Sequence, residues 1–352
     1  MSTVRMPAAF QHYACQRSLI CCGDPVRAPC EDEERDRIRP VLASTAQGRG
    51  YLPIFEASTE AFLNTKVFKH DNGVCQHLRL EGQDDATESG CSLHFLGGVD
   101  ALSTACRNYP RWVTRLAVEP GSQVEMEAMF LLGCPTVAGL LVRDPRPFSF
   151  VEVPLDSWIY TPTREATIEA TARAQMLREG WWRVLADGRD DPERLLAVLD
   201  AMVKAPLDAP EGEPARNTEL PPHFFYGTGI SEAGQMLGVL ERIPDRGGTY
   251  AAHHWDVRHD ISLNVKRGEL VEMLGIAPEL LSAYLDHSVP FAGLHDERPT
   301  HHWMKTTVRR TIAIARLADA LLARVPFAID TLLADLMVCT MQLDGMLTRP
   351  DA

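Results

Sequence analysis

Histidine, the side chain best suited to hold a transition metal at neutral pH, is concentrated in one part of this sequence. Eight of the twelve histidines lie between His223 and His302. A neutral imidazole nitrogen ligates transition metals and haem iron. Aspartate stands beside several of these histidines, as in His259-Asp260, and a carboxylate that accepts the distal ring N–H strengthens the other nitrogen as a ligand. The cluster indicates a bound metal or haem, although an isolated histidine is far more often an ordinary surface residue.

Haem is the first chemistry that this cluster suggests. His301 and His302 begin a segment in which apolar residues recur every three or four positions. A haem-ligating histidine at the head of a long apolar helix gives this pattern, because the helix wall packs on the porphyrin face. The spacing alone does not choose between the two histidines. The haem propionates would pair with Lys305, Arg309 and Arg310. Alternatively, these cations belong to an ordinary solvent-exposed face of the helix.

Mononuclear non-haem Fe(II) is the alternative chemistry. His254 and Asp256 form the H-x-D half of a facial triad, and His302 or its neighbour would be the third ligand. Such triads usually lie on strands, whereas the flanking sequence here has a helical pattern. A dinuclear helical site ranks third, because the chain contains no Glu-x-x-His pair. A metal-sensing or pH-responsive surface without catalysis is also open.

One stretch of the chain resembles a known family. The run His302-Trp-Met-Lys-Thr-Thr-Val-Arg-Arg is similar to the proximal-histidine helix of tryptophan 2,3-dioxygenase and of related haem-dependent aromatic oxygenases, which include tyrosine hydroxylases. The similarity covers about a dozen residues. It implies a haem-dependent oxygenase that uses dioxygen or peroxide to hydroxylate or cleave a small aromatic amino acid or derivative, in specialised metabolite biosynthesis.

The same resemblance implies roles for individual residues. His302, or His301, would ligate the iron, and His259 would be a second histidine upstream, either a sixth iron ligand that is displaced on activation or a distal hydrogen-bonding group. His254 would donate hydrogen bonds on the distal side together with His259. Trp255 and Trp303 would stack on the substrate, and their equally plausible alternative is core packing, since tryptophan is highly buried on average.

Composition excludes several classes of function. Acidic residues outnumber basic ones by 48 to 35, which gives a net charge of −13. We therefore expect no nucleic-acid partner and no anionic membrane partner, since either needs a positive surface. No apolar stretch long enough to span a bilayer and no secretory signal is visible. Nine irregularly spaced cysteines favour reduced thiols and a cytoplasmic location. Composition does not indicate whether the chain is a monomer or a homo-oligomer.

The pattern of apolar residues predicts a mainly α fold with a smaller mixed α/β region at the N-terminus. We expect four parts: a mixed α/β region over 1–119, a helical region over 120–204, a proline-rich linker or lid over 205–222, and a helical, histidine-rich cofactor region over 223–352.

Capping residues and apolar spacing also predict individual elements. The expected helices cover 122–132, 136–142, 163–188, 192–202, 229–242, 265–275, 278–286, 304–323 and 327–347. The expected strands cover 76–80, 92–96 and 148–153.

Overall fold

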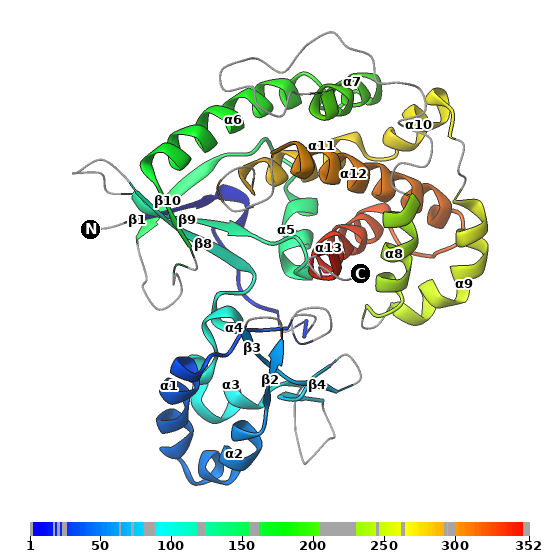
Figure 1. Cartoon of the computed structure of the whole chain (residues 1–352). Coiled ribbons are helices and arrows are strands. Elements are labelled where there is room, and N and C mark those ends of the chain that lie inside the picture. The colour runs from blue at the N-terminus through cyan, green and yellow to red at the C-terminus, as the bar shows by residue number, and fades with distance from the viewer. Residues whose placement is uncertain are drawn as a thin grey trace. The chain divides into compact units, whose positions relative to one another are not determined.

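The computed structural model (Figure 1) divides the chain into two compact units. It describes residues 3–16, 18–19, 22, 27–62, 65–71, 74–80, 89–117, 124–154, 162, 164–204, 230–243, 246–261, 265–291, 294 and 300–347, with the backbone alone at 124–125, 164, 203–204, 230–231, 300–302 and 341–347. Unit 1 comprises Met1–Ala14, Trp112–Leu155 and Pro162–Leu343. Unit 2 comprises Cys15–Arg111, Asp156–Thr161 and Asp344–Ala352.

Unit 1 contains a mixed five-stranded sheet in the order β10-β1-β9-β8-β11. Strand β1 runs parallel to β9 and antiparallel to β10, and β11 runs parallel to β8. The five strands are β1 (Thr3–Pro7), β8 (Arg111–Leu116), β9 (Val124–Phe130), β10 (Phe150–Pro154) and β11 (Arg164–Ala166).

A buried ion network joins this sheet to a helix. Glu127 on β9 is fully buried and accepts hydrogen bonds from Arg5 Nε at 3.1 Å and from Arg178 Nη1 at 3.0 Å. Arg178 is itself 1% exposed. A buried charge is tolerated only when it is paired and hydrogen-bonded. The network therefore fixes the helix that carries Arg178 against the sheet.

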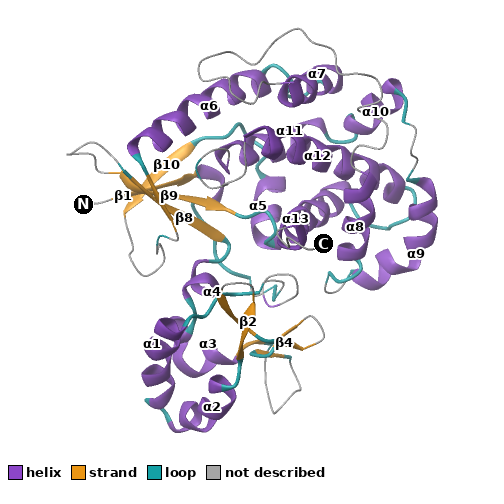
Figure 2. Cartoon of the chain, in the orientation of Figure 1, coloured by secondary structure: helices purple, strands orange, loops and turns teal. Residues whose placement is uncertain are grey.

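The rest of unit 1 is helical (Figure 2), and one long helix, α12, lies at its centre. α12 contacts α7, α8, α9, α10 and α11, and almost every side chain between Val308 and Ala318 is buried. The α-helices of the unit are α5 (Pro135–Arg143), α6 (Ile168–Ala186), α7 (Pro192–Lys204), α8 (Ile230–Leu240), α9 (Gly247–Asp260), α10 (Arg267–Leu274), α11 (Pro278–Ser288), α12 (Thr300–Leu322) and α13 (Ile329–Leu347). Two 3-10 turns, η1 (Ala8–Phe10) and η5 (Val289–Phe291), complete it.

Unit 2 contains short helices and hairpins that pack around a small apolar core. The strands of the hairpins are two to four residues long. Ile38, Leu42, Phe55, Phe68 and Leu93 are the largest side chains of this core. The helices are α1 (Asp32–Ala43), α2 (Ala46–Glu56), α3 (Ser92–Gly97), η3 (Gly98–Ala101) and α4 (Thr104–Asn108). The hairpins are β2 (Thr59–Phe62) with β3 (Thr65–Phe68), β4 (His70–Asp71) with β5 (Val74–Cys75), and β6 (Leu78–Arg79) with β7 (Gly90–Cys91).

The predicted fold class, mainly α with a mixed α/β N-terminal region, is confirmed. The four-part division stays a prediction, and the proline-rich segment 205–222 lies outside the described residues. None of the described helices is both long enough and apolar enough to cross a membrane.

Two predicted elements are wrong, and a third begins later than expected. The helix expected over 122–132 is strand β9, and the alternation of Glu125 and Glu127 with apolar neighbours is the period-two pattern of a strand. The strand expected over 92–96 is helix α3, in which Leu93 and Leu96 lie three positions apart on one face. The helix expected from 163 begins only at Ile168, because 164–166 pair with β8 as strand β11.

Candidate ligand-binding site

The first pair of predicted metal ligands lies on the surface of α9. His254 Nδ1 contacts the Glu241 carboxylate, and Arg258 Nη1 donates to His254 Nε2 at 3.4 Å. Both ring nitrogens are therefore already engaged. Asp256 is exposed, and because it lies two positions further along a helix, its side chain points about 200° away around the axis. The structure does not bring His254 and Asp256 together as an H-x-D pair.

His259 and Trp255 form a second surface pair on α9. Their rings meet edge to face with centroids 5.5 Å apart. Trp255 is 72% exposed, and His259 is exposed as well. In this position Trp255 cannot sandwich a substrate inside a closed pocket, and His259 faces outward rather than into the core of unit 1.

The predicted cofactor residues on α12 separate onto two faces of the helix. Trp303 is 4% exposed and Arg310 7% exposed. Lys305 and Arg309 are exposed, and Arg309 Nη1 lies 3.9 Å from Glu232 Oε1. Trp303 therefore serves as core packing, and only Arg310 of the three cations faces inward.

His301 and His302 are described by their backbone alone, so only their places along α12 are known. Residues four apart lie on the same face of a helix. Position 301 thus shares the exposed face of Lys305 and Arg309, whereas position 302 shares the face of Thr306 and Arg310, which are both buried. Within the described side chains, no group of three or more His, Cys, Asp or Glu residues could hold a metal ion.

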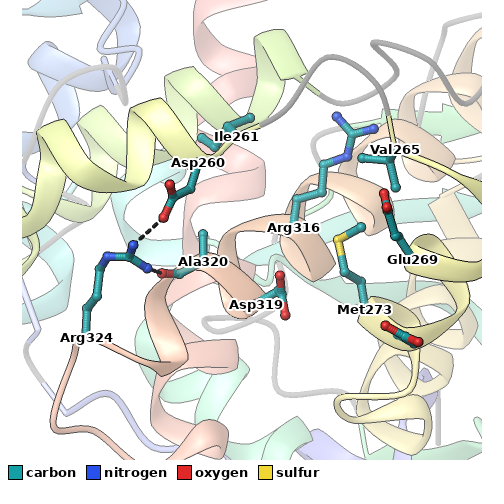
Figure 3. Close-up of a pocket in the computed structure, with 10 residues that line it drawn as sticks. Asp260, Ile261, Val265, Glu269, Met273, Arg316, Asp319, Ala320 and Arg324 are labelled. Atoms are coloured by element: carbon teal, nitrogen blue, oxygen red, sulfur yellow. Dashed lines mark hydrogen bonds and ion pairs between the residues drawn. The ribbon is translucent and has the colours of Figure 1, made fainter.

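A cavity of about 420 Å³ opens between α10 and α12, beside the end of α9 (Figure 3). Its walls follow from helical spacing, since each helix presents residues at positions i, i+3 and i+4. From α12 come Arg316, Asp319 and Ala320. The remaining lining residues are Asp260, Ile261, Val265, Glu269, Glu272, Met273 and Arg324. All of them belong to unit 1.

The most buried charge in the cavity wall is Arg316. The residue is 4% exposed, and desolvation by burial lowers the pKa of its guanidinium from the usual value. An arginine stays protonated even so, and it offers five N–H donors in a rigid fork. The apolar side chains of Ile261, Val265 and Met273 line the same cavity. A charged fork in apolar surroundings is the chemistry that proteins use to hold a carboxylate or phosphate.

Four carboxylates surround this cation at the exposed edge of the cavity, and two of them have structural partners. Asp260 forms an ion pair with Arg324, which also donates to the Ala320 carbonyl at 2.6 Å. Glu269 Oε2 accepts the backbone N–H of Lys266 at 3.0 Å and so caps α10. The ion pair joins the end of α9 to the end of α12, and the cap fixes the start of α10.

The other two carboxylates, Glu272 and Asp319, have no such role. Both are exposed, and neither forms a hydrogen bond or ion pair with any residue that the structure describes. The cavity therefore combines a buried cation with uncommitted negative charge at its mouth.

Sequence reasoning missed this cavity, because its lining runs from Asp260 to Arg324, 64 positions apart. One local signal was present. Arg316 interrupts the apolar run from Ile312 to Ala318, where a charged residue has no obvious reason to be buried. An isolated arginine in an apolar helix face indicates a candidate functional site, as a cluster of histidines does.

Comparison of the chain with protein-family models, with curated proteins and with solved structures finds no match in any of the three. The chemistry of the cavity and of the histidine-rich helices is therefore inferred from their own residues.

Proposed function

We propose that this chain binds a small organic molecule in the cavity between α10 and α12, through an anionic group that pairs with Arg316. The observation that carries the proposal is that Arg316, a residue only 4% exposed, lines the wall of a cavity. A volume of about 420 Å³ lies in the range of small-molecule sites. The planar guanidinium of an arginine pairs well with a carboxylate or phosphate through two parallel hydrogen bonds.

The experiment replaces Arg316 by methionine, which keeps the length and apolar character of the stem but removes the charge. Thermal unfolding of the purified protein is followed with a panel of small carboxylates, phosphates and amino acids. We expect at least one compound to raise the Tm of the wild type and not that of Arg316→Met. Arg309→Met is the matched control, because it removes an exposed arginine from the same helix. A panel that stabilises the wild type and Arg316→Met equally would show that Arg316 anchors nothing.

Arg316→Lys guards against a folding defect. Lysine keeps the positive charge but lacks the planar guanidinium. The substitution should therefore weaken binding of the anion, while a positive charge remains in the cavity. A graded loss from arginine to lysine to methionine, with similar circular dichroism for all three, is the signature of an anion anchor.

Our second proposal is a haem-dependent oxygenase that acts on a small aromatic amino acid or derivative. The observation that favours it is the register of α12, in which position 302 shares its face with buried Thr306 and Arg310. This register supports His302 rather than His301 as the ligand. Haem would supply the activation of dioxygen or peroxide. His254 and His259 do not fit a distal site, because they lie on the surface of α9, and we assign no step to them.

The absorbance spectrum of protein made in cells supplied with a haem precursor tests this second proposal. We expect a Soret band in the wild type and in His301→Ala, and its loss in His302→Ala. A colourless wild type that contains iron would favour the non-haem Fe(II) alternative, and one without iron would end both. We also propose a cytoplasmic location, on the cysteine pattern alone.

A further inference from the structure

We infer that residues 144–149 form a strap that a proton releases: when the buried imidazole of His287 takes up a proton, the strap opens and uncovers the ring of Trp182. The strap joins the end of α5 to the start of β10 and has no regular secondary structure. It carries Phe148, whose ring lies on both His287 and Trp182. All of these residues belong to unit 1, and none of them lines the cavity between α10 and α12.

The contacts of His287 fix its neutral form. The residue is 3% exposed, and its Nδ1 lies 2.9 Å from the carbonyl oxygen of Ala283. A carbonyl oxygen can only accept a hydrogen bond, so Nδ1 carries the proton and Nε2 keeps its lone pair. Nε2 forms no hydrogen bond with any residue that the structure describes. A second proton would therefore create a charged donor that finds no acceptor among these residues, and this is costly in a buried place.

The charged groups around His287 come from three elements. Burial is the main reason that the pKa of this imidazole falls from 6.5 to about 4. The charge of Arg189, just after α6, also lowers this pKa, whereas Asp144 at the end of α5 raises it. Asp144 is paired with Arg146, and Asp286, the neighbour of His287 on α11, is paired with Arg189. The closed strap therefore lies over an uncharged ring.

Phe148 attaches the strap to α6 and α11. Its ring stacks on Trp182 with centroids 4.8 Å apart and an interplanar angle of 15°, and it meets His287 edge to face at 5.1 Å. Its backbone N–H donates to the carboxylate of Asp286. The two prolines of the strap have no N–H group to donate. The attachment thus converges on His287 and its neighbours, so a charge on this imidazole acts directly on the residue that holds the strap.

Two phenylalanines pack on His287, and Phe148 is the one that can leave. The ring of Phe10 lies 5.3 Å from the imidazole between centroids, but Phe10 is fully buried and also packs on Phe130 at 5.0 Å. Phe148 is only half-buried and lies outside every helix and strand. Local opening of such a segment costs less than opening of a packed core. Water then reaches the imidazole while the sheet and the helices stay folded.

The two pKa values of His287 set the size of the effect. In the open state the imidazole meets water and titrates near its usual 6.5, and in the closed state it titrates at about 4. Between these values only the open state binds the proton, so the open population rises as the pH falls through this window. From pH 7.5 to pH 5 the equilibrium constant for opening should increase about thirtyfold.

Hydrogen exchange of the Phe148 amide measures the opening, because this N–H is protected while it donates to Asp286. The exchange rate is measured at pH 7.5 and pH 5 and divided by the intrinsic rate of an unprotected amide at the same pH. We expect the protection of Phe148 to fall about thirtyfold, while amides in the middle of α6 and α11 keep theirs. An equal loss of protection throughout unit 1 would mean that the whole unit opens, and the strap would have no role.

His287→Asn separates the imidazole from the carboxyl of Asp286, whose pKa burial raises. Asparagine can still donate to the carbonyl of Ala283 but cannot be protonated, so the pH dependence should disappear. His12→Asn is the matched control, because it changes an exposed histidine close in sequence to Phe10, and it should keep the thirtyfold change. An undiminished pH dependence in His287→Asn would assign the response to Asp286 and overturn the inference.

Phe148→Ala keeps the test decisive if His287→Asn does not fold. The side chain of Phe148 is half-buried and lies outside the helices and strands, so the variant should fold, as circular dichroism will check. Without this ring the strap should be open at pH 7.5, and NMR of the histidine ring protons should show His287 titrating near 6.5 instead of about 4. A pKa that stays near 4 without Phe148 would show that the strap does not cover this imidazole.

Discussion

His77 in unit 2 makes the stability of that unit depend on pH. The side chain is 1% exposed, and its Nδ1 lies 2.9 Å from the Tyr51 hydroxyl. Its ring packs edge to face on Phe68 with centroids 4.8 Å apart, and the buried Nε2 has no hydrogen-bond partner among the described residues. Desolvation lowers the pKa of His77 from 6.5 to about 4. The folded unit therefore holds this imidazole neutral.

The sign of the effect follows from proton linkage. Between pH 6.5 and about 4 the unfolded chain binds a proton at His77 and the folded chain does not. Stability must therefore fall as pH is lowered through this window. At about 1.36 kcal/mol for each pH unit, the loss from this residue is limited to about 3.4 kcal/mol and reaches about 2 kcal/mol at pH 5.

The perturbation is His77→Phe, which keeps an aromatic ring among Phe55 and Phe68 but cannot be protonated. Urea unfolding is measured at pH 7.5 and pH 5, and hydrogen exchange of peptides from residues 51–56 and 74–80 reports on unit 2 itself. The wild type should lose about 2 kcal/mol more than His77→Phe between the two pH values. His94→Asn, a change of a less buried histidine in the same unit, should lose as much as the wild type. Equal pH dependence in wild type and His77→Phe would refute the reasoning.

Three further outcomes follow from contacts and backbone geometry. Glu127→Gln removes the carboxylate that compensates buried Arg178, so urea unfolding should show a loss of about 3–5 kcal/mol; Glu165→Gln, at a side chain 78% exposed, should stay within about 0.5 kcal/mol. Gly98→Ala places a Cβ at φ 64°, ψ −156°, and the Tm should drop by the equivalent of about 1–3 kcal/mol; an unchanged Tm contradicts the strain. Trp255→Ser should change stability by less than about 0.5 kcal/mol, since this ring is 72% exposed, and a larger loss would mean that it packs against something.

Elements whose signals are local were predictable from the sequence. The run Asp191-Pro192-Glu193 predicts the start of a helix, and α7 begins at Pro192. Asp191 Oδ1 accepts the backbone N–H groups of Glu193 and Arg194 at 3.0 and 3.3 Å, as the capping argument requires. The break between the helices expected over 304–323 and 327–347 likewise separates α12 from α13. These features depend on neighbours a few positions away.

Elements that depend on distant partners were not predictable in the same way. Strand β9 pairs with β1, more than a hundred positions earlier, and its carboxylate Glu127 is buried only because Arg5 and Arg178 meet it there. A glutamate in the sequence looks like a solvated residue until its partners are known. The same holds for Arg316, whose burial depends on α10 and the end of α9.

His301 and His302 lie in the first turn of α12, whereas the cavity is lined by residues from the later part of the same helix. Positions 302 and 316 are separated by about 21 Å along α12 at the helical rise of 1.5 Å per residue. A substrate in the cavity would therefore be out of reach of an iron held at position 302, and each proposal stands or falls on its own residue. His302→Ala should leave ligand affinity in the cavity unchanged, whereas Arg316→Met should leave any Soret absorbance unchanged. Loss of both properties in one of these variants would mean that α12 transmits a change along its length, and that the two sites are coupled through the core of unit 1.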